Sequence, residues 1–298
     1  MLEYSSMKLW KYIFSTLLLV LAVIVLAISQ LPDSNLHIIS CDVGQGDAIL
    51  ITYKEIQILT DGGPDNSVLE CLGRHMPFYD REIEVVISTH PDSDHITGLV
   101  SVLQGYKVGK ILINPIDSGT EVYKALVLEV GGRGVQVVNP TTGMQLGIGL
   151  IHLDILNPTD ELFSKVSPDD EESDLARYKR IKDTNLYSIV YRLSLKDFSG
   201  LFTGDMPPEI SDSLAKDWSN GHLNYIKVSH HGSINGITEN LIKVTTPDIA
   251  SISVGKNRWG FPRPEILDIL NRNNVQVLRT DQMGDVEVVT NGEKMWVR

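Results

Sequence analysis

Residues 83–95 read IEVVISTHPDSDH, a short apolar strand that runs into a dense group of polar side chains. His90, Asp92, Asp94 and His95 place two imidazoles and two carboxylates within six positions. Such a group is costly to hold together unless cations neutralise it, and its oxygen and nitrogen donors suit zinc, manganese or iron. Pro91 and the end of the strand favour a loop that aims these side chains at neighbouring points. The stretch therefore predicts a metal site.

Three other apolar strands also end in acidic or histidine residues, namely Asp61, Asp205 and the pair His230-His231. Strand ends along one edge of a sheet can converge on one site. We expect Asp205 to bridge two cations and one histidine of the pair to complete the metal ligands. The other imidazole would contact substrate or move a proton, and the sequence leaves open which is which.

The expected chemistry is hydrolysis. A water held by cations ionises near neutral pH and attacks a phosphorus or carbonyl centre. The catalytic candidates are Asp94, Asp92 and His231.

Composition narrows the class of protein. The 298 residues are 42% hydrophobic and 21% charged, which is typical of a globular protein and excludes collagen, a disordered tail and a small disulfide scaffold. The formal net charge of −12 disfavours a protein that coats nucleic acid broadly. It leaves room for an enzyme that grips a phosphodiester through metal ions.

The N-terminal segment is strongly apolar. Residues 10–31 would span about 33 Å as a helix, so we expect a membrane anchor over residues 1–32 and a hydrolase domain over 33–298. Lys8 and Lys11 precede the apolar stretch and favour a single-pass protein whose catalytic domain lies outside the cytoplasm.

The alternative for this segment is a signal peptide cleaved after Ala27, which would release a secreted protein. In either case Cys41 and Cys71 would lie in an oxidising compartment, and the sequence leaves open whether they pair.

Helices and strands alternate along the chain, but hairpin-like pairs also occur, such as 148–156 with 186–195. This mixture favours layered sheets and helices over a purely parallel doubly wound sheet.

Taken together, the motifs resemble those of the metallo-β-lactamase superfamily, whose signature is His-x-His-x-Asp-His after a strand. They resemble more closely the hydrolase domain of the ComEC-type DNA-uptake proteins. The segments that carry this resemblance are 42–48 (DVGQGDA), 90–95, 204–205, 229–233 (SHHGS) and 253–257, and it extends over residues 36–298. It implies an α+β fold, a four-layer αββα sandwich with metals at one edge of two facing sheets.

The resemblance also assigns residues. It implies one or two divalent ions, Zn or Mn, held by His90, Asp92, Asp94, His95, Asp205 and His230. Behind these ligands, Asp61 and Asn185 would orient the site, and Ser233, Lys256 and Asn257 are candidates for binding substrate. Basic residues near the late motifs are candidates for holding phosphates: Lys227, Lys243, Lys256, Arg258 and Arg263.

This chain departs from the family pattern at three positions. Asp92 replaces the second histidine of the superfamily signature, and Asn185 lies near the place of the middle histidine. A position poor in nitrogen donors favours manganese over zinc. Phe261 stands before Pro262 where ComEC-type proteins usually have histidine.

The sequence therefore predicts a membrane-anchored, metal-dependent phosphodiesterase or nuclease acting on DNA or another phosphodiester, with a separate channel protein as a partner. Two alternatives stay open. One is a hydrolase of another ester or amide, such as a phosphocholine, a lactone or a β-lactam. The other is a non-catalytic module that recruits DNA or an uptake channel. The oligomeric state is not predicted.

Overall fold

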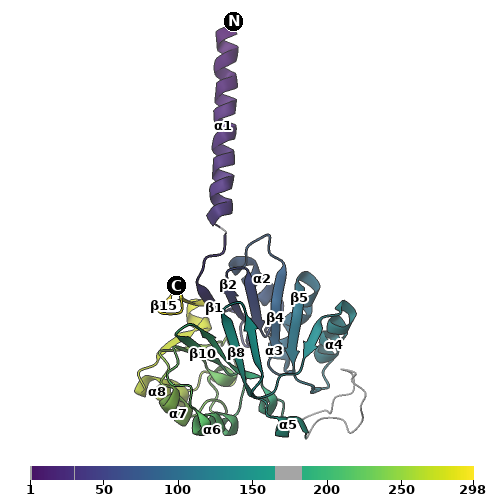
Figure 1. Ribbon diagram of the computed structural model, residues 1–298, viewed down its shortest axis with the longest axis vertical. Coiled ribbons are helices and arrows are strands. Elements are labelled where there is room, and N and C mark those ends of the chain that lie inside the picture. The colour runs from purple at the N-terminus through teal and green to yellow at the C-terminus, as the bar shows by residue number, and fades with distance from the viewer. Residues whose placement is uncertain (1, 30, 165–182) are drawn as a thin grey trace.

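The computed structural model describes residues 2–29, 31–164 and 183–298, and in the first helix it describes the side chains of residues 10–25. Two β-sheets lie face to face, with helices on their outer faces (Figure 1).

The first sheet has the strand order β15-β14-β1-β2-β3-β4-β5-β6. Strands β3 to β6 run parallel to one another, whereas β1, β2, β14 and β15 pair in antiparallel fashion, so the sheet is mixed. Its strands are β1 (Leu36–Ser40), β2 (Ile49–Tyr53), β3 (Ile56–Thr60), β4 (Glu82–Ser88), β5 (Lys107–Ile113), β6 (Gln136–Val138), β14 (Val286–Thr290) and β15 (Met295–Val297).

The second sheet has the order β13-β12-β11-β10-β9-β8-β7 and is also mixed, with β10 to β13 parallel and β7 to β10 antiparallel. Its strands are β7 (Gln145–Ile148), β8 (Ile151–Asn157), β9 (Val190–Leu195), β10 (Phe198–Phe202), β11 (Tyr225–Lys227), β12 (Ile249–Ile252) and β13 (Gln276–Arg279).

Central strands such as β2 carry apolar side chains on both faces, because helices cover the outer face of each sheet. In β9, Tyr191, Leu193 and Leu195 belong to the core between the sheets, whereas Val190 packs in the layer beneath the helices. This follows from the two-residue period of a strand, which turns successive side chains to opposite faces.

Helices close the two outer layers. Leu72, Leu99 and Leu126 of α2, α3 and α4 pack on the first sheet, and Leu241 and Ile266 of α7 and α8 pack on the second. The helices are α2 (Ser67–His75), α3 (Ser93–Gly105), α4 (Glu121–Arg133), α5 (Asp160–Ser164), α6 (Pro208–Asp217), α7 (Glu239–Thr245), α8 (Pro264–Arg272) and α9 (Thr280–Met283), with short 3₁₀ turns η2 (Asn185–Tyr187) and η3 (Ser229–Gly232). The predicted αββα sandwich is confirmed.

The N-terminal helix α1 (Leu2–Ser29) extends away from the sheets (Figure 1). The predicted membrane span over residues 10–31 lies partly outside the described residues. In the part of the chain that is described, no helix is both long and apolar enough to cross a bilayer. The prediction of a transmembrane helix is therefore not supported.

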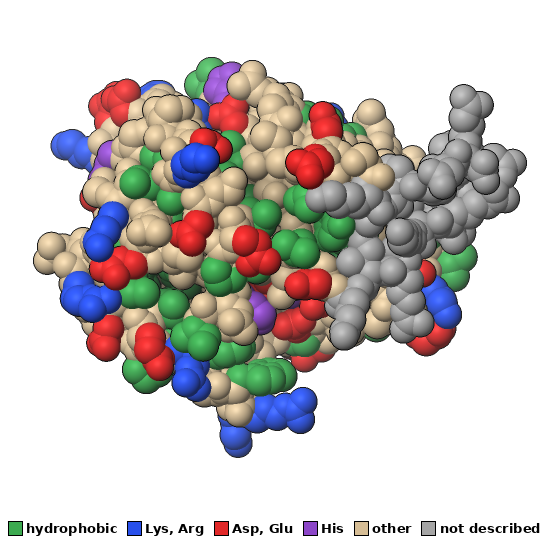
Figure 2. All heavy atoms as spheres, turned by 90° about the horizontal axis from the view of Figure 1, so that it is seen from below, with side chains coloured by type: hydrophobic (Ala, Val, Ile, Leu, Met, Phe, Trp, Pro, Cys, Tyr) green, Lys and Arg blue, Asp and Glu red, His purple; other side chains and the backbone are tan. Residues whose placement is uncertain are grey.

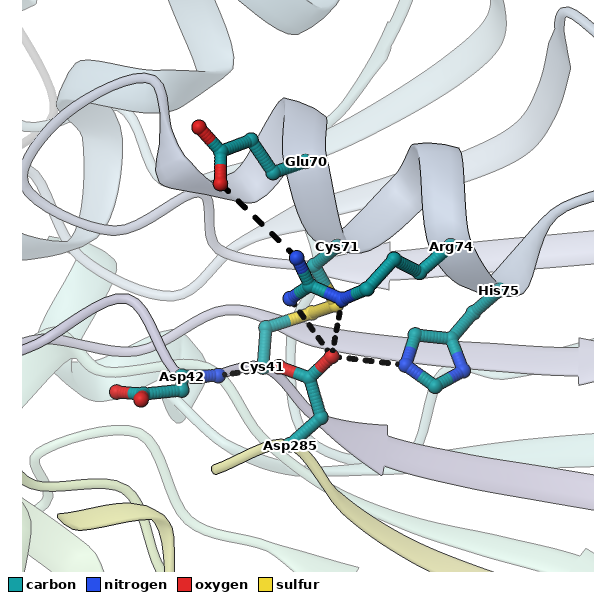
Figure 3. Close-up of a disulfide and its surroundings, with 7 residues drawn as sticks. All are labelled: Cys41, Asp42, Glu70, Cys71, Arg74, His75 and Asp285. Carbon is teal, nitrogen blue, oxygen red and sulfur yellow. Dashed lines mark hydrogen bonds and ion pairs between the residues drawn. A yellow bond between two sulfur atoms is a disulfide. The ribbon is translucent and has the colours of Figure 1, made fainter.

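A disulfide joins Cys41, the residue after β1, to Cys71 in α2, with 5.9 Å between the two Cα atoms. Beside it, the carboxylate of Asp285 accepts hydrogen bonds from the backbone N–H of Asp42 at 2.8 Å, from Arg74 Nε at 2.9 Å and from His75 Nε2 at 2.8 Å (Figure 3). These contacts hold the start of the 42–48 loop against α2, and that loop leads to the site described next.

Candidate metal centre

Three buried histidines converge beyond the ends of strands from the two sheets. His90 comes two residues after β4, His95 lies in the first turn of α3, and His231 lies in η3 after β11. The ring centroids of His90 and His95 are 4.1 Å apart, and those of His95 and His231 are 5.5 Å apart. His90 and His95 are five residues apart in the chain, whereas His231 follows a strand of the other sheet, so the sandwich itself brings His231 to the pair.

The Nδ1 atoms of these three rings are all engaged. His95 Nδ1 donates to Asp61 Oδ2 at 2.8 Å and His231 Nδ1 donates to the Ser253 carbonyl at 2.9 Å, because both acceptors lack a proton to give. The hydroxyl of Thr89 donates its own proton to Asp61 at 2.7 Å and therefore accepts from His90 Nδ1 at 3.0 Å.

The opposite ring nitrogens make no hydrogen bonds within the described residues. Nε2 of His90, His95 and His231 is buried and makes no hydrogen bond to the described residues. A ring whose Nδ1 is held and whose Nε2 is free is the arrangement that metal-binding histidines adopt.

Two carboxylates face these free nitrogens. Asp205 Oδ2 lies 3.4 Å from His95 Nε2 and 3.6 Å from His231 Nε2, and Asp94 Oδ2 lies 3.3 Å from His231 Nε2. Ligand atoms of Asp94, His95 and His231 lie within 4.8 Å of one another, and so do those of His90, His95 and Asp205. Two imidazole nitrogens with two carboxylate oxygens form a donor set that fits Zn or Mn.

Asp92 lies at the margin of the cluster. Its Oδ2 is 3.7 Å from His90 Nε2, its side chain is 42% exposed, and its Oδ1 accepts a hydrogen bond from the Thr184 hydroxyl at 2.7 Å. The part of the site around His90 is therefore poorer in close donors than the part around His231.

Behind the histidines lies a buried ion pair between Lys227 and Asp47. Lys227 Nζ also donates to the Gly204 carbonyl at 2.8 Å and lies 3.4 Å from Asp205 Oδ1. Asp47 Oδ1 is 3.5 Å from His231 Nδ1. Lys227 thus holds one oxygen of Asp205, while the other oxygen faces the histidines.

Electrostatics at the site follow from this clustering. Burial by itself would lower the pKa of His231, but the carboxylates of Asp205 and Asp47 outweigh it and raise the pKa to about 10. The pKa of His95 is likewise raised, against burial, by Asp205 and Asp61. Burial and the neighbouring His95 lower the pKa of His90. In the cation-free protein the carboxylates therefore keep protons on His95 and His231.

The backbone is strained at several of these positions. Asp61, His230 and His231 have positive φ angles of 58°, 52° and 54°, a region that costs a non-glycine residue about 1–3 kcal/mol. Gly46 approaches α3 so closely that a Cβ atom there would lie 2.3 Å from the carbonyl oxygen of Asp94. Such strain gathers at functional sites, where the surrounding fold enforces it.

A cavity of about 1010 Å³ opens onto the cluster. Its lining includes Asp92, Asp94, Asp205 and His231 together with residues of the 256–261 loop. The face away from α1 shows a histidine among acidic side chains, with hydrophobic and basic side chains next to them (Figure 2). The cavity therefore gives solvent access to Asp94, Asp205 and His231.

Solved structures share this architecture. The metallo-β-lactamase fold protein YhfI from Bacillus subtilis superposes with a TM-score of 0.54 at 11% identity, covering 88% of this chain and 100% of YhfI. The chain has a metallo-β-lactamase fold.

Sequence relatives of this metallo-β-lactamase-fold chain are of the ComEC type. ComE operon protein 3 from Bacillus subtilis is 29% identical over 266 residues, which cover 83% of this chain and 32% of that protein. Recombination protein 2 from Haemophilus influenzae is 26% identical over 278 residues, 91% of this chain and 31% of that protein. The chain thus spans about a third of the length of these curated relatives. No protein-family model matches it.

The metallo-β-lactamase fold brings together most of the predicted ligands, namely His90, Asp92, Asp94, His95 and Asp205. Asp61 lies behind them as predicted and holds His95. One local prediction was wrong: α3 begins at Ser93, so Asp94 and His95 project from the first turn of a helix and not from a loop.

The adjacent histidines occupy different places. His231 belongs to the clustered ligand atoms, whereas His230 lines the cavity, with its ring centroid 5.8 Å from that of Phe261. The geometry therefore favours His231, and not the predicted His230, as the metal ligand.

Asn185 lies in η2, next to the residue that binds Asp92, and its Oδ1 is buried without a partner among the described residues. The substrate-binding candidates Ser233, Lys256 and Asn257 all line the cavity. The side chain of Asn257 is engaged within its own loop, where it bonds to Gly255, Trp259 and Phe261.

Two buried residues had no predicted role in the centre. Lys227 was a candidate for holding phosphate, but it is buried among carboxylates and is not available to a substrate. Asp47 is the second-last residue of the 42–48 motif, and this motif was its only signal in the sequence. Asp47 lies just before one apolar strand, and Lys227 ends another. Their opposite charges at these strand ends were the pattern that could have suggested an ion pair.

Proposed function

We propose that this protein is a metal-dependent hydrolase of phosphodiesters, with DNA as the leading substrate. The observation that carries the proposal is the set of three buried, free Nε2 atoms facing Asp94 and Asp205 at the mouth of a cavity. A divalent Zn or Mn ion bound there supplies a Lewis acid that activates water and polarises the scissile group.

Each side chain has a distinct part in this proposal. Asp94, His95, His231 and Asp205 would hold one ion, and His90 with Asp92 would offer a second, weaker position. Asp61 and Ser253 hold the imidazoles in the orientation that binding requires. His230, which lines the cavity, is placed to contact the substrate or to move a proton.

The choice of a phosphodiester rests on charge and on the relatives. Lys256 and Arg258 line the same cavity as the ligands and would neutralise a phosphate despite the acidic net charge. One relative carries the name Recombination protein 2, which points to DNA. The fold alone does not choose the substrate.

We further propose that the protein acts outside the cytoplasm. The Cys41–Cys71 disulfide supports this location, because disulfides persist in oxidising compartments. Anchoring through the N-terminal segment and a separate channel partner stay predictions from the sequence.

The test uses the full chain, loaded with Mn or Zn and incubated with labelled single-stranded DNA. Asp94→Asn is expected to lower the rate at least about 100-fold, since it removes a ligand carboxylate. Asp248→Asn, at an exposed aspartate paired with His222, is the matched control and should retain activity. A phosphocholine, a lactone and a β-lactam are assayed in parallel. Turnover of one of these without cleavage of nucleic acid would overturn the proposal.

A further inference from the structure

Two aromatic rings lie side by side at the rim of the cavity. The ring centroids of Trp259 and Phe261 are 6.0 Å apart and their planes differ by 17°, so the rings are stacked. Trp259 is 51% exposed, which is unusual for the largest apolar side chain. Both rings line the same cavity as Asp94 and His231.

The loop that carries these rings is ordered in advance by Asn257. Its Oδ1 accepts hydrogen bonds from the backbone N–H groups of Trp259 at 3.1 Å and Phe261 at 2.9 Å. Its Nδ2 donates to the carbonyls of Gly255 at 2.9 Å and Phe261 at 3.0 Å. A ligand that stacks here would therefore not have to order the loop, and binding would lose little conformational entropy.

Charge limits what the rings can bind. The Arg258 guanidinium lies over the Trp259 ring, 5.2 Å from its centroid, and Lys256 is exposed on the same loop. A cationic headgroup such as choline would meet like charge beside the ring. A flat, uncharged base attached to a phosphate would instead stack on the aromatic face and pair with the basic side chains.

We propose that Trp259 and Phe261 form a stacking platform that binds bases of single-stranded nucleic acid beside the metal centre. This inference rests on the proposed function and narrows its substrate class. Duplex bases already stack on one another, so a paired strand cannot use the platform without being opened. Stacking on one aromatic side chain changes affinity by about 5- to 150-fold per base.

The test measures binding of labelled dT15 to the full chain in EDTA by fluorescence anisotropy, so that no cleavage intervenes. Trp259→Ala should weaken binding at least about fivefold. Trp296→Ala is the matched control, since Trp296 is 43% exposed in β15 and does not line the cavity. An abasic oligomer of the same length should bind the unaltered protein about as weakly as dT15 binds the Trp259→Ala variant. A comparison of the KM of the Trp259→Ala variant with that of the unaltered protein, made in Mn, extends the test to the metal-bound protein. The variant should have the higher KM.

Three results would overturn the platform. These are equal binding by Trp259→Ala and the unaltered protein, equal binding of the abasic oligomer and dT15, and binding of duplex or of choline phosphate in preference to dT15. Each leaves the proposed function standing if DNA is still cleaved. If the unaltered protein neither binds nor cleaves nucleic acid, the proposed function is overturned, and the platform with it.

Discussion

Lys227 Nζ lies 3.4 Å from Asp205 Oδ1 in the buried layer behind the histidines. Burial would lower the pKa of this lysine, but Asp47 and Asp205 outweigh it and raise the pKa above its ordinary value. A charged lysine is therefore the counter-ion for two buried carboxylates, and it fixes the oxygen of Asp205 that faces away from the histidines.

Lys227→Met is expected to destabilise the cation-free protein by about 3–5 kcal/mol, because it leaves buried carboxylates without their partner. The measurement is the free energy of unfolding from denaturant titration in EDTA. Lys243→Met is the control, since Lys243 is an exposed residue of α7 that pairs with Glu239, and it should change stability by less than about 0.5 kcal/mol. Equal stability of the Lys227→Met and unaltered proteins would contradict the counter-ion role.

The two adjacent histidines should differ sharply in metal binding. His231→Ala removes a ligand and is expected to weaken binding of Zn or Mn more than about 100-fold. This loss exceeds the one typical of replacing a residue that only hydrogen-bonds to a ligand. His230→Ala should bind nearly as well as the unaltered protein. Competition with a chromogenic chelator measures both affinities. The assignment fails if His230→Ala is the variant that loses the metal.

Metal binding should release protons at neutral pH. The raised pKa of His231, about 10, and that of His95 mean that both rings are protonated near pH 7 in the cation-free protein. A metal must displace those protons, so affinity should rise as pH increases and level off above about pH 10. Calorimetry in two buffers of different ionisation enthalpy counts the protons, and we expect between about one and two. A binding enthalpy independent of the buffer would refute this.

Reduction of the Cys41–Cys71 disulfide should lower the free energy of unfolding by about 2–4 kcal/mol, since it frees a loop with a sequence separation of 30 residues. Denaturant titrations with and without reductant measure the change. The double variant Cys41→Ala, Cys71→Ala is the control and should not respond to reductant. Unchanged stability of the unaltered protein, with its thiols shown to be reduced, would count against the disulfide as a stabilising link.

Much of the site could be predicted from local spacing. The strand followed by His90, Asp92, Asp94 and His95 predicted the metal cluster, because a strand end leaves consecutive polar side chains at one edge of a sheet. Asp61 and Asp205 were predicted for the same reason, and their positions in the structure agree. The alternation of strands and helices, together with the hairpin-like pairs, was enough to predict layered sheets and helices, whereas the four-layer αββα sandwich was predicted from the family resemblance.

The remaining features depend on contacts between segments far apart in the chain. Asp47 and Lys227 meet 180 positions apart, and neither segment alone indicates that the other will neutralise its charge. His230 and His231 are chemically identical neighbours, and only their left-handed backbone and the Ser253 carbonyl select which imidazole turns inward. The sequence by itself thus determined which residues can bind a metal, through their chemistry and spacing. The tertiary structure alone decided which nitrogen and oxygen atoms face one another, because those directions are set by packing between the two sheets.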